Sequence, residues 1–221
     1  MTYLIGDSLE ILPTLGDKSY DFCLTDFPYN VDFKGTKSEN RFKGVYYTDN
    51  QGESEYQLFC EETFNELSRI TNGMMIFCGN MNQYMWMQIA KPRDILIWHK
   101  PNCQGRGSSY YLNKHEIRLS YGTHRKMPTS VITQNVKSYP ITELRNSIHP
   151  CPSSLDLYRF ILDKIQPKSV LDPFLGSGTT AAACEMLGIP YLGIEKEKAY
   201  IPDIEKRIKQ GQQSSLMGYL E

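Results

Sequence analysis

The sequence predicts an α/β fold, in which a mostly parallel sheet carries helices on both of its faces. Short runs of β-branched and aromatic residues alternate with helical patterns along the whole chain, which is typical of this class. The composition agrees, because 40% hydrophobic and 22% charged residues in a chain of 221 are ordinary for a domain with a continuous core. We therefore expect a single domain over residues 1–221.

The first half of the chain is expected to hold four strands and three helices. Each strand is a short apolar run closed by Gly, Pro, Asp or Asn, and each helix carries apolar residues at spacings of three to four. In chain order these elements are strand Tyr3 to Ile5, helix Ser8 to Leu15, strand Tyr20 to Thr25, helix Glu53 to Ile70, strand Gly73 to Cys78, helix Asn80 to Ala90 and strand Asp94 to Trp98.

The second half is expected to hold three further strands, which makes seven, and three further helices. Ser153 or Ser154 can cap the first of these helices, and Gly188 follows the second. In chain order these elements are strand Glu116 to Tyr121, helix Ser153 to Ile165, strand Ser169 to Asp172, helix Thr179 to Leu187, strand Pro190 to Ile194 and helix Ala199 to Gln210, before a polar tail from Gly211.

Three stretches fit no regular element: Val31 to Gly52, Pro101 to Lys114 and Thr123 to His149. Each mixes Lys or Arg with Gly, Asn, Ser and Tyr, and long loops in compact domains are more often functional than not. We expect them to contact the substrate.

Several classes of protein are disfavoured. The N-terminus has neither a basic segment nor an apolar run of signal-peptide or membrane length, so a cytoplasmic protein is expected. The six cysteines and four histidines lack the spacings of a zinc site or a disulfide framework, so we expect no metal.

The charges are unevenly distributed. The segment 91–150 has ten Lys or Arg against three acids, a surplus of seven positive charges in a chain whose net charge is −1. Such a segment suits a polyanion such as nucleic acid, although a solvated basic face is an equal alternative on charge alone.

A glycine-rich turn near the C-terminus is the strongest local signal. In the sequence SVLDPFLGSGTT, residues 169–180, a buried strand runs through Gly176 and Gly178 into a helix that Thr179 and Thr180 can cap. A dinucleotide or a sulfonium nucleoside could bind there. The absence of GxGxxG and of GK[ST] disfavours a pyrophosphate, and Glu195, after the next strand, can accept bonds from ribose hydroxyls. The alternative is a glycine cap with an exposed acid.

An acidic and aromatic turn, Asp26-Phe27-Pro28-Tyr29, follows the second expected strand. The chemistry of this turn suits an exocyclic amine of a nucleic-acid base. Such an amine is a poor nucleophile because its lone pair is delocalised into the ring, so it needs hydrogen-bond acceptors for both of its hydrogens. Asp26 can supply one and the Phe27 carbonyl, held by Pro28, another, while Tyr29 can stack on the base. The alternative is an ordinary turn at the end of a strand.

The two turns together resemble the β-class amino-methyltransferases of DNA. DPFLGSGTT is similar to the family's motif I, DPFxGSGTT, and DFPY is similar to its motif IV, DPPY or SPPY, with Phe27 in place of the first proline. The stretch HPCPS at His149 matches the first two residues of the family's HPxxKP but lacks the lysine. The resemblance covers residues 3–208.

The resemblance implies a Rossmann-like methyltransferase fold, circularly permuted so that the catalytic half comes first and the cofactor half last. It implies S-adenosylmethionine as cofactor, and catalytic roles for the four residues of the Asp26 turn. The residues implied at the cofactor are Asp7, Asp26, His149, Asp172, Pro173, Phe174, Gly176, Ser177, Gly178, Thr179, Thr180, Glu195 and Lys196.

The implied substrate is double-stranded DNA, in which the target base must be flipped out of the stack. A short target-recognition insertion is expected at residues 121–148, which leaves a homodimer open as a way to complete the contacts. The residues expected to contact nucleic acid are Lys34, Lys37, Arg41, Lys43, Arg106, Arg125 and Lys126.

The expected reaction is direct in-line methyl transfer to N6 of adenine, because Asp26 at the first position of motif IV resembles the N6-adenine members. It would serve restriction-modification or act as an orphan methylase. Cys103 and Cys151 lack the context of the cysteine nucleophile of C5-cytosine methylation. The alternatives are N4-cytosine methylation, a non-catalytic DNA-binding module with a vestigial cofactor pocket, and a Rossmann-type oxidoreductase.

Overall fold

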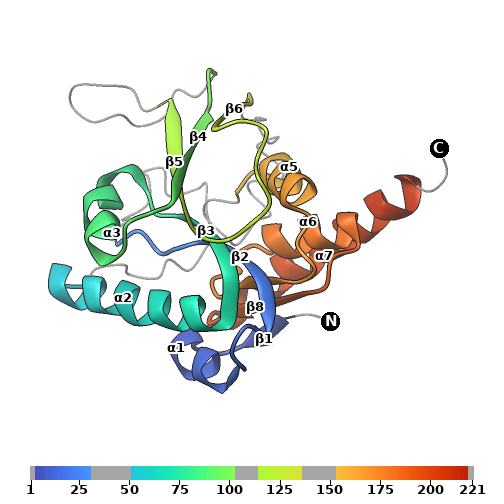
Figure 1. The fold of residues 1–221 in the computed structure, drawn as a ribbon. Helices are drawn as coiled ribbons and strands as arrows, with labels where there is room; N and C mark the ends of the chain where they lie inside the picture. Colours follow the sequence, from blue (N-terminus) through green and yellow to red (C-terminus); the bar gives the residue numbers. More distant parts are fainter. Residues whose placement is uncertain (1–2, 31–50, 103–113, 136–152, 219–221) are drawn as a thin grey trace, which may run out of the picture.

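A computed structural model describes residues 3–30, 51–102, 114–135 and 153–218. Eight strands form one sheet in the order β1-β8-β7-β2-β3-β5-β4-β6 (Figure 1). β5 is antiparallel to β3 and β4, and the other paired strands are parallel. The strands are β1 Tyr3–Ile5, β2 Tyr20–Asp26, β3 Thr71–Phe77, β4 Asp94–His99, β5 His115–Gly122, β6 Val131–Thr133, β7 Val170–Asp172 and β8 Tyr191–Glu195. The predicted α/β class and the mostly parallel sheet are confirmed.

The predicted number of seven strands is wrong, because β6 lies inside the stretch Thr123 to His149 that was expected to be irregular. β6 buries only Ile132, and the residues on either side of the strand are polar, so no apolar run marks the strand. It forms by pairing with β4, where Ile97 lies opposite Val131 and Trp98 opposite Ile132. A contact between distant segments creates this strand.

Helices form at all six predicted places within the described ranges. The predicted helix Ser8 to Leu15 divides into an α-helix and a 3-10 turn that contains Pro13, which cannot donate a backbone hydrogen bond. The last helix continues to Gly218, through part of the expected polar tail. The helices are α1 Ser8–Ile11, α2 Glu53–Ile70, α3 Gln83–Ile89, α5 Leu155–Ile165, α6 Thr179–Leu187 and α7 Ile201–Gly218, with 3-10 turns η1 Leu12–Thr14, η2 Asn80–Asn82 and η3 Lys198–Tyr200. None of the described helices is both long and apolar enough to span a membrane.

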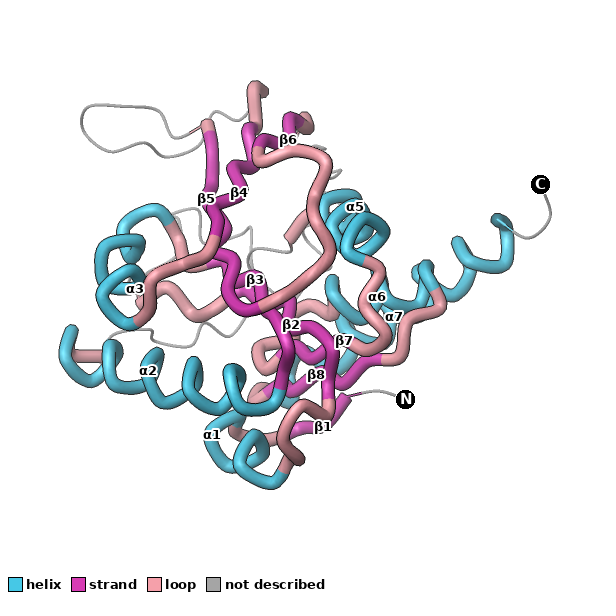
Figure 2. The backbone as a smooth tube through the Cα atoms, in the orientation of Figure 1, coloured by secondary structure: helices cyan, strands magenta, loops and turns pink. Residues whose placement is uncertain are grey.

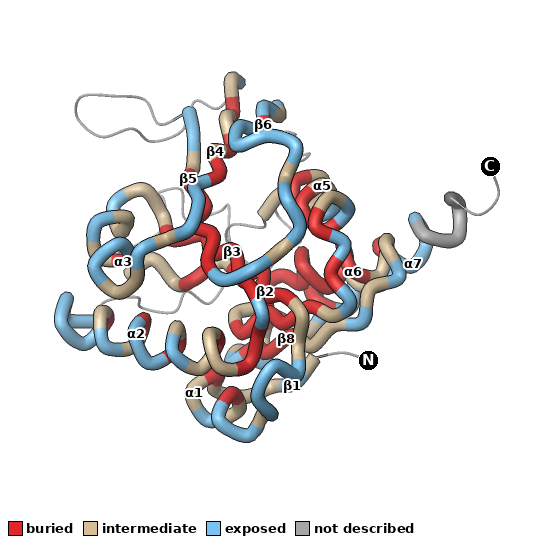
Figure 3. Tube along the Cα trace, viewed as in Figure 1, coloured by how far each residue is buried: buried red, intermediate tan, exposed pale blue. Residues whose placement is uncertain are grey.

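The sheet separates two hydrophobic clusters because successive side chains of a strand point to opposite faces. Phe22 and Leu24 of β2 pack with α5 and α6, whereas Cys23 between them packs with α2 and α3. Figure 2 shows the strands passing between the two groups of helices, and Figure 3 shows buried positions concentrated in the central strands. The prediction of helices on both faces is confirmed.

The parallel strands end at one edge of the sheet, which we call the carboxyl edge. β2 and β7 are neighbours there, and the chain leaves them in opposite directions, from β2 to β3 and from β7 to β8. In open α/β sheets, ligands bind outside the carboxyl ends of the strands at such a reversal. β2, β7 and β8 end in Asp26, Asp172 and Glu195.

Candidate active site

The Asp26 turn and the glycine turn meet at the carboxyl edge between β2 and β7. Phe22 lies opposite Val170 and Cys23 opposite Leu171, so Asp26 and Asp172 end neighbouring strands. The Thr25 hydroxyl, one residue before Asp26, donates to Asp172 Oδ1 over 2.6 Å. The structure therefore brings the two predicted motifs into direct contact.

Each carboxylate oxygen of Asp26 accepts a side-chain hydrogen bond. The Tyr29 hydroxyl donates to Oδ1, and the Ser153 hydroxyl donates to Oδ2 over 3.0 Å. Burial raises the pKa of Asp26 to about 6, although the two hydroxyls and the charge of Arg118 lower it. Asp26 is therefore ionised at neutral pH and is a strong hydrogen-bond acceptor.

The residues after Asp26 are held by the core and by neighbouring helices. The Phe27 side chain is buried, with its ring centroid 4.6 Å from that of Trp86 and 4.8 Å from that of Phe174. The Pro28 carbonyl accepts from the Tyr56 hydroxyl over 2.5 Å. The departure from the family's proline thus inserts an aromatic ring into the core, where it contacts the glycine turn.

Asp172, at the end of β7, stabilises the glycine turn through hydrogen bonds from residues of the turn. Its Oδ1 accepts from Thr25 and from the Phe174 backbone N–H over 3.1 Å, and its Oδ2 accepts from the Thr180 hydroxyl over 2.5 Å. Burial raises the pKa of Asp172 to about 6, while these hydrogen bonds lower it. Each of these hydrogen bonds comes from a protein donor, so Asp172 orders the turn that is predicted to bind the cofactor.

Both glycines of the turn have positive φ, 54° at Gly176 and 84° at Gly178, a conformation that glycine adopts without strain. A Cβ at Gly178 would lie 3.0 Å from the Ile204 Cα, so α7 approaches this turn closely. The expected capping by Thr179 or Thr180 is wrong, because Gly178 itself is the N-cap of α6 and no side chain caps the helix. The Thr180 hydroxyl is instead drawn to Asp172.

The acid predicted for the ribose also lies at this turn. Glu195 Oε2 accepts from the Gly176 N–H over 2.7 Å, and Oε1 accepts from the Glu197 N–H over 2.8 Å. Burial raises the pKa of Glu195. Each oxygen has a second lone pair, so the carboxylate can still accept hydroxyl donors.

Asp7 and Lys196 pair beside Glu195. Lys196 Nζ lies 2.7 Å from Asp7 Oδ2, and Asp7 Oδ1 caps α1 by accepting from the Leu9 N–H over 2.9 Å. Burial would raise the pKa of Asp7, but Lys196 and the Leu9 N–H hold it below its ordinary value. The described cofactor-half residues therefore gather where β1, β7 and β8 end.

Two serines of the site were not predicted. Ser153 donates to Asp26, and its backbone carbonyl accepts from the Thr179 hydroxyl over 3.5 Å, so it joins the two turns. Ser8 donates to the Pro173 carbonyl. Ser154, one of the two predicted caps, is confirmed as the N-cap of α5. A signal for Ser153 existed, since it occupies the place of the lysine in the family's HPxxKP.

A buried charge cluster lies beside Asp26. The Arg118 side chain is 1% exposed, its guanidinium lies 3.6 Å from the Phe77 ring centroid, and it donates to Glu116 over 2.9 Å. Lys100, also buried, pairs with the same carboxylate. Burial would raise the pKa of Glu116, but these two cations lower it. Two of the ten basic residues in segment 91–150 are thus paired inside the protein and cannot contact a polyanion.

Arg125 lies at the opposite edge of the sheet from Asp26. It donates to Gln166 past the end of α5, and it lines a cavity of about 280 Å³ with Asp21 and Phe22 at the start of β2. Because β2 spans seven residues, the two ends of the strand are about 20 Å apart. Since β5 is antiparallel, the chain leaves it at this distant edge. Arg125 and the adjoining Lys126, both predicted to contact nucleic acid, therefore lie far from Asp26, and their contact with DNA stays a prediction.

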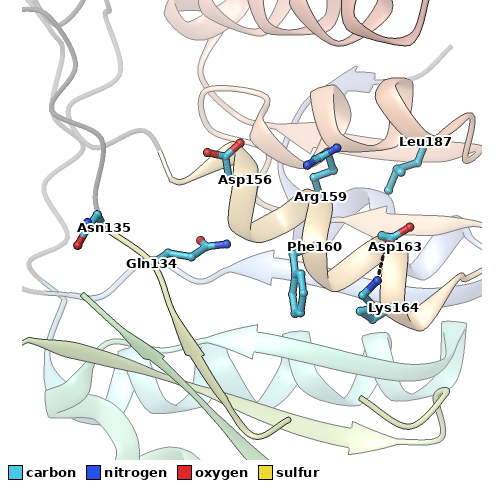
Figure 4. Close-up of a pocket in the computed structure, with 8 residues that line it drawn as sticks. All are labelled: Gln134, Asn135, Asp156, Arg159, Phe160, Asp163, Lys164 and Leu187. Atoms are coloured by element: carbon cyan, nitrogen blue, oxygen red, sulfur yellow. Dashed lines mark hydrogen bonds and ion pairs between the residues drawn. The ribbon is translucent and has the colours of Figure 1, made fainter. Parts of the chain in front are cut away.

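A larger cavity of about 630 Å³ lies along α5 (Figure 4). Two acidic and two basic residues line it, and Lys164 pairs with Asp163 over 2.7 Å. The charges of the lining residues therefore balance, and the cavity does not favour an anion or a cation. It contains none of the predicted motif residues. Its lining residues are Gln134, Asn135, Asp156, Arg159, Phe160, Asp163, Lys164 and Leu187.

Some predicted residues lie outside the described residues: Lys34, Lys37, Arg41, Lys43, Arg106 and His149, together with Cys103 and Cys151. Within the described ranges, no three His, Cys, Asp or Glu side chains lie close enough to hold a metal ion.

Comparison with known proteins gives a consistent result. A family model described as DNA methylase matches residues 20–206. The Type II methyltransferase M.HinfI of Haemophilus influenzae is 30% identical over 249 residues, which covers 95% of this chain and 68% of that relative.

Solved structures resemble the fold. The crystal structure of the M1.HpyAVI-SAM complex has a TM-score of 0.67 at 23% identity and covers 94% of this chain and 98% of that one. The PvuII DNA methyltransferase (cytosine-N4-specific) has a TM-score of 0.69 at 15% identity and covers 97% of this chain and 90% of that one. At these identities the two likenesses establish the fold alone.

Proposed function

We propose, from the premise that this chain belongs to the N6/N4 DNA methylase family, that it methylates N6 of an adenine flipped out of double-stranded DNA. Membership of the family makes the chain an S-adenosylmethionine-dependent DNA methyltransferase, which removes the oxidoreductase and the non-catalytic module as alternatives. The choice of adenine is our inference from Asp26. We also propose that its motif order reflects a circular permutation of a single domain.

The residues at the glycine turn fit the cofactor. Gly176 and Gly178 have no side chains, so a ligand at the carboxyl edge can approach their backbone closely. Glu195 has lone pairs free to accept hydrogen bonds from hydroxyl groups. Asp7 and Lys196 lie beside it and are proposed to contact the adenosine. Asp172, Phe174, Thr179 and Thr180 shape the turn. When bound, S-adenosylmethionine would supply a methyl group on a positively charged sulfur. The sulfur would become a neutral thioether as the methyl group passes to the amine.

Asp26 carries the catalytic part of the proposal. Its carboxylate accepts one hydrogen of the target amine, and the Phe27 carbonyl accepts the other, since the carbonyls of Pro28 and Tyr29 already bind Tyr56 and Asn82. Two acceptors on one nitrogen favour its pyramidal form and direct its lone pair toward the glycine turn. After transfer the nitrogen loses its extra proton to Asp26 and then to solvent.

Tyr29 is proposed to stack on the flipped base. A Cβ at Gly79 would lie 3.3 Å from the Tyr29 Cγ, so one face of the ring is covered by Gly79. The other face is proposed to receive the base. The hydrogen bond from the Tyr29 hydroxyl to Asp26 Oδ1 is then replaced by one from the target amine to the same oxygen.

The DNA contacts are proposed to come from the carboxyl edge. The stretch that carries Lys34, Lys37, Arg41 and Lys43 begins directly after Asn30, next to the Asp26 turn. In the recognition region 121–148, the part after β6 follows a strand that ends at the carboxyl edge, whereas the part before β6 starts at the far edge. We therefore assign base reading to residues 134–148, and a homodimer is the proposed way to extend this short region.

Nucleoside analysis tests the choice of base. DNA treated with the protein and S-adenosylmethionine is digested, and N6-methyladenine is expected. N4-methylcytosine alone would overturn the adenine assignment and leave the family intact. Sedimentation of the protein with and without a DNA duplex tests the homodimer.

A further inference from the structure

A ridge of exposed apolar side chains lies close to the Asp26 turn. Met81 is 84% exposed and Tyr84 is 74% exposed, and these are the two most exposed large apolar side chains in the described ranges. Met87, three residues further on, is also exposed. Residues three apart share one side of a helical segment, so Met81, Tyr84 and Met87 form a continuous stripe, here called the Met81 ridge.

The ridge is attached directly to the residues proposed to hold the target base. Asn82 donates to the Tyr29 carbonyl over 2.8 Å and to the Tyr56 hydroxyl over 3.2 Å. Gly79 lies against the Tyr29 ring, and β3 ends beside Asp26, with Phe77 opposite it in the sheet. Met81 lies between Gly79 and Asn82 in the chain, so its backbone is next to two residues that contact Tyr29.

The other side of α3 anchors the ridge in the core. Trp86 is fully buried and packs edge-on against Phe27, the residue that follows Asp26. Burial of one side of a helix fixes which of its residues face outward. The backbone that carries the ridge is therefore held in place relative to the catalytic turn by the packing of Trp86 on Phe27.

We propose that Met81 enters the DNA stack at the position vacated by the target base, and that Tyr84 packs on the adjoining nucleotide. The proposal rests on the proposed function, which requires a flipped base. A vacated position leaves base faces without stacking partners, and apolar side chains such as Met fill such gaps in DNA. The segment from Asn80 to Ile89 carries no acidic residue, so it does not repel the phosphates. Duplex DNA is thus the partner that this surface fits.

The test compares Met81→Ser with Leu58→Ser, which removes another exposed apolar side chain, on α2. Two duplexes are used, one fully paired and one with a mismatch opposite the target base. A mismatched base is already easier to extrude, so Met81→Ser should lower kcat/KM about tenfold on the paired duplex and less than about threefold on the mismatched one. Met81→Leu should retain the wild-type values, and Leu58→Ser should change neither.

Fluorescence of 2-aminopurine at the target position reports extrusion without methyl transfer. It should increase when wild-type protein binds and increase less with Met81→Ser. Equal losses on both duplexes, or no loss on either, would overturn the proposal, as would dissociation of a wild-type dimer by Met81→Ser, because the ridge would then be a contact between copies. A wild-type protein that extrudes the base but transfers no methyl group would instead refute the proposed function.

Discussion

Asp26 depends on partners that come from three different parts of the chain. Tyr29 and Ser153 each occupy one of its oxygens, and the charge of buried Arg118 acts on it from β5. The charged and titratable groups that face it are Tyr29, Cys78, Glu116, Arg118 and Tyr158. Its state is therefore a balance between burial, which favours the neutral acid, and donors, which favour the ion.

Asp26→Asn should separate catalysis from folding. Loss of the carboxylate should lower kcat by about 10²-fold or more, because the amide cannot stabilise positive charge developing on the nitrogen. S-adenosylmethionine affinity, measured by calorimetry, should stay within about threefold of wild type, since the residues proposed to hold the cofactor cluster around Gly176 and Glu195. Unchanged turnover would remove Asp26 from the mechanism.

The same variant should not be less stable than wild type at neutral pH. The pKa of Asp26 rises from 3.8 to about 6 on folding, so ionisation opposes the folded state. The stability that the neutral acid provides is present below about pH 4 and is lost as the pH rises to about 6. The Tm of Asp26→Asn relative to wild type should therefore be higher at pH 7.5 than at pH 4, and the reverse order would contradict the assignment.

Ser153→Ala should shift the acid limb of the pH-rate profile. The Ser153 hydroxyl lowers the pKa of Asp26 in the wild type, so its removal should raise the midpoint and slow the reaction most at low pH. Activity at pH 8.5 should recover toward wild type. Ser154→Ala is the matched control, because it removes the cap of α5 and costs about 1 kcal/mol of stability without moving the midpoint. A shared midpoint would show that Ser153 does not act through Asp26.

At the scale of elements, α6 connects the glycine turn to the core. It begins after Gly178 and ends before Gly188, and both glycines are left-handed. Their surroundings differ, since a Cβ at Gly178 would lie 3.0 Å from the Ile204 Cα whereas nothing lies within 4 Å of a Cβ at Gly188. A substitution at either glycine would strain the left-handed backbone, but only a substitution at Gly178 would also push against α7. Comparing the two therefore distinguishes the effect of backbone strain from the effect of close packing.

Gly178→Ala should weaken S-adenosylmethionine binding by about tenfold or more, because the new methyl group presses α7 away from the turn and disfavours the left-handed conformation. Gly188→Ala should cost only the strain of a left-handed alanine, about 1 kcal/mol, and leave cofactor affinity unchanged. Calorimetry and thermal unfolding of both variants measure the two effects. Equal cofactor affinities would show that the Gly178 turn does not contact the ligand.

At the scale of the whole molecule, the proposed DNA contacts distinguish the basic residues that follow the Asp26 turn in the chain from Arg125 and Lys126 at the far edge of the sheet. Replacement of Lys34, Lys37, Arg41 and Lys43 by Ala should flatten the salt dependence of DNA binding, with a slope change of about 0.9 for each phosphate that is no longer neutralised. The control, Arg125→Ala with Lys126→Ala, changes the far edge and should leave the slope unchanged. A slope that changes only in the control would mean that DNA crosses the other edge.

Much of the fold could be predicted because it depends on local patterns. Strand and helix spacings predicted six helices and seven of the eight strands, and the two motifs predicted a site shared by Asp26 and Gly176. The exception among the strands was β6, whose three residues gain order from β4. The direction of β5 has no local signal either, and it decides that Arg125 lies far from Asp26.

The sequence by itself determined the fold class, the family and the two turns, because each depends on residues close together in the chain. Only the tertiary structure decided how Asp26 is held. Ser153 lies 127 positions away in the chain. Arginine is usually found at the protein surface, but Arg118 is buried. The tertiary structure likewise decided that Phe27 packs between Trp86 and Phe174 and that Met81 stands exposed beside Tyr29. The reason is physical, since burial and long-range hydrogen bonds depend on which strands become neighbours, and strand order is not encoded in any local spacing.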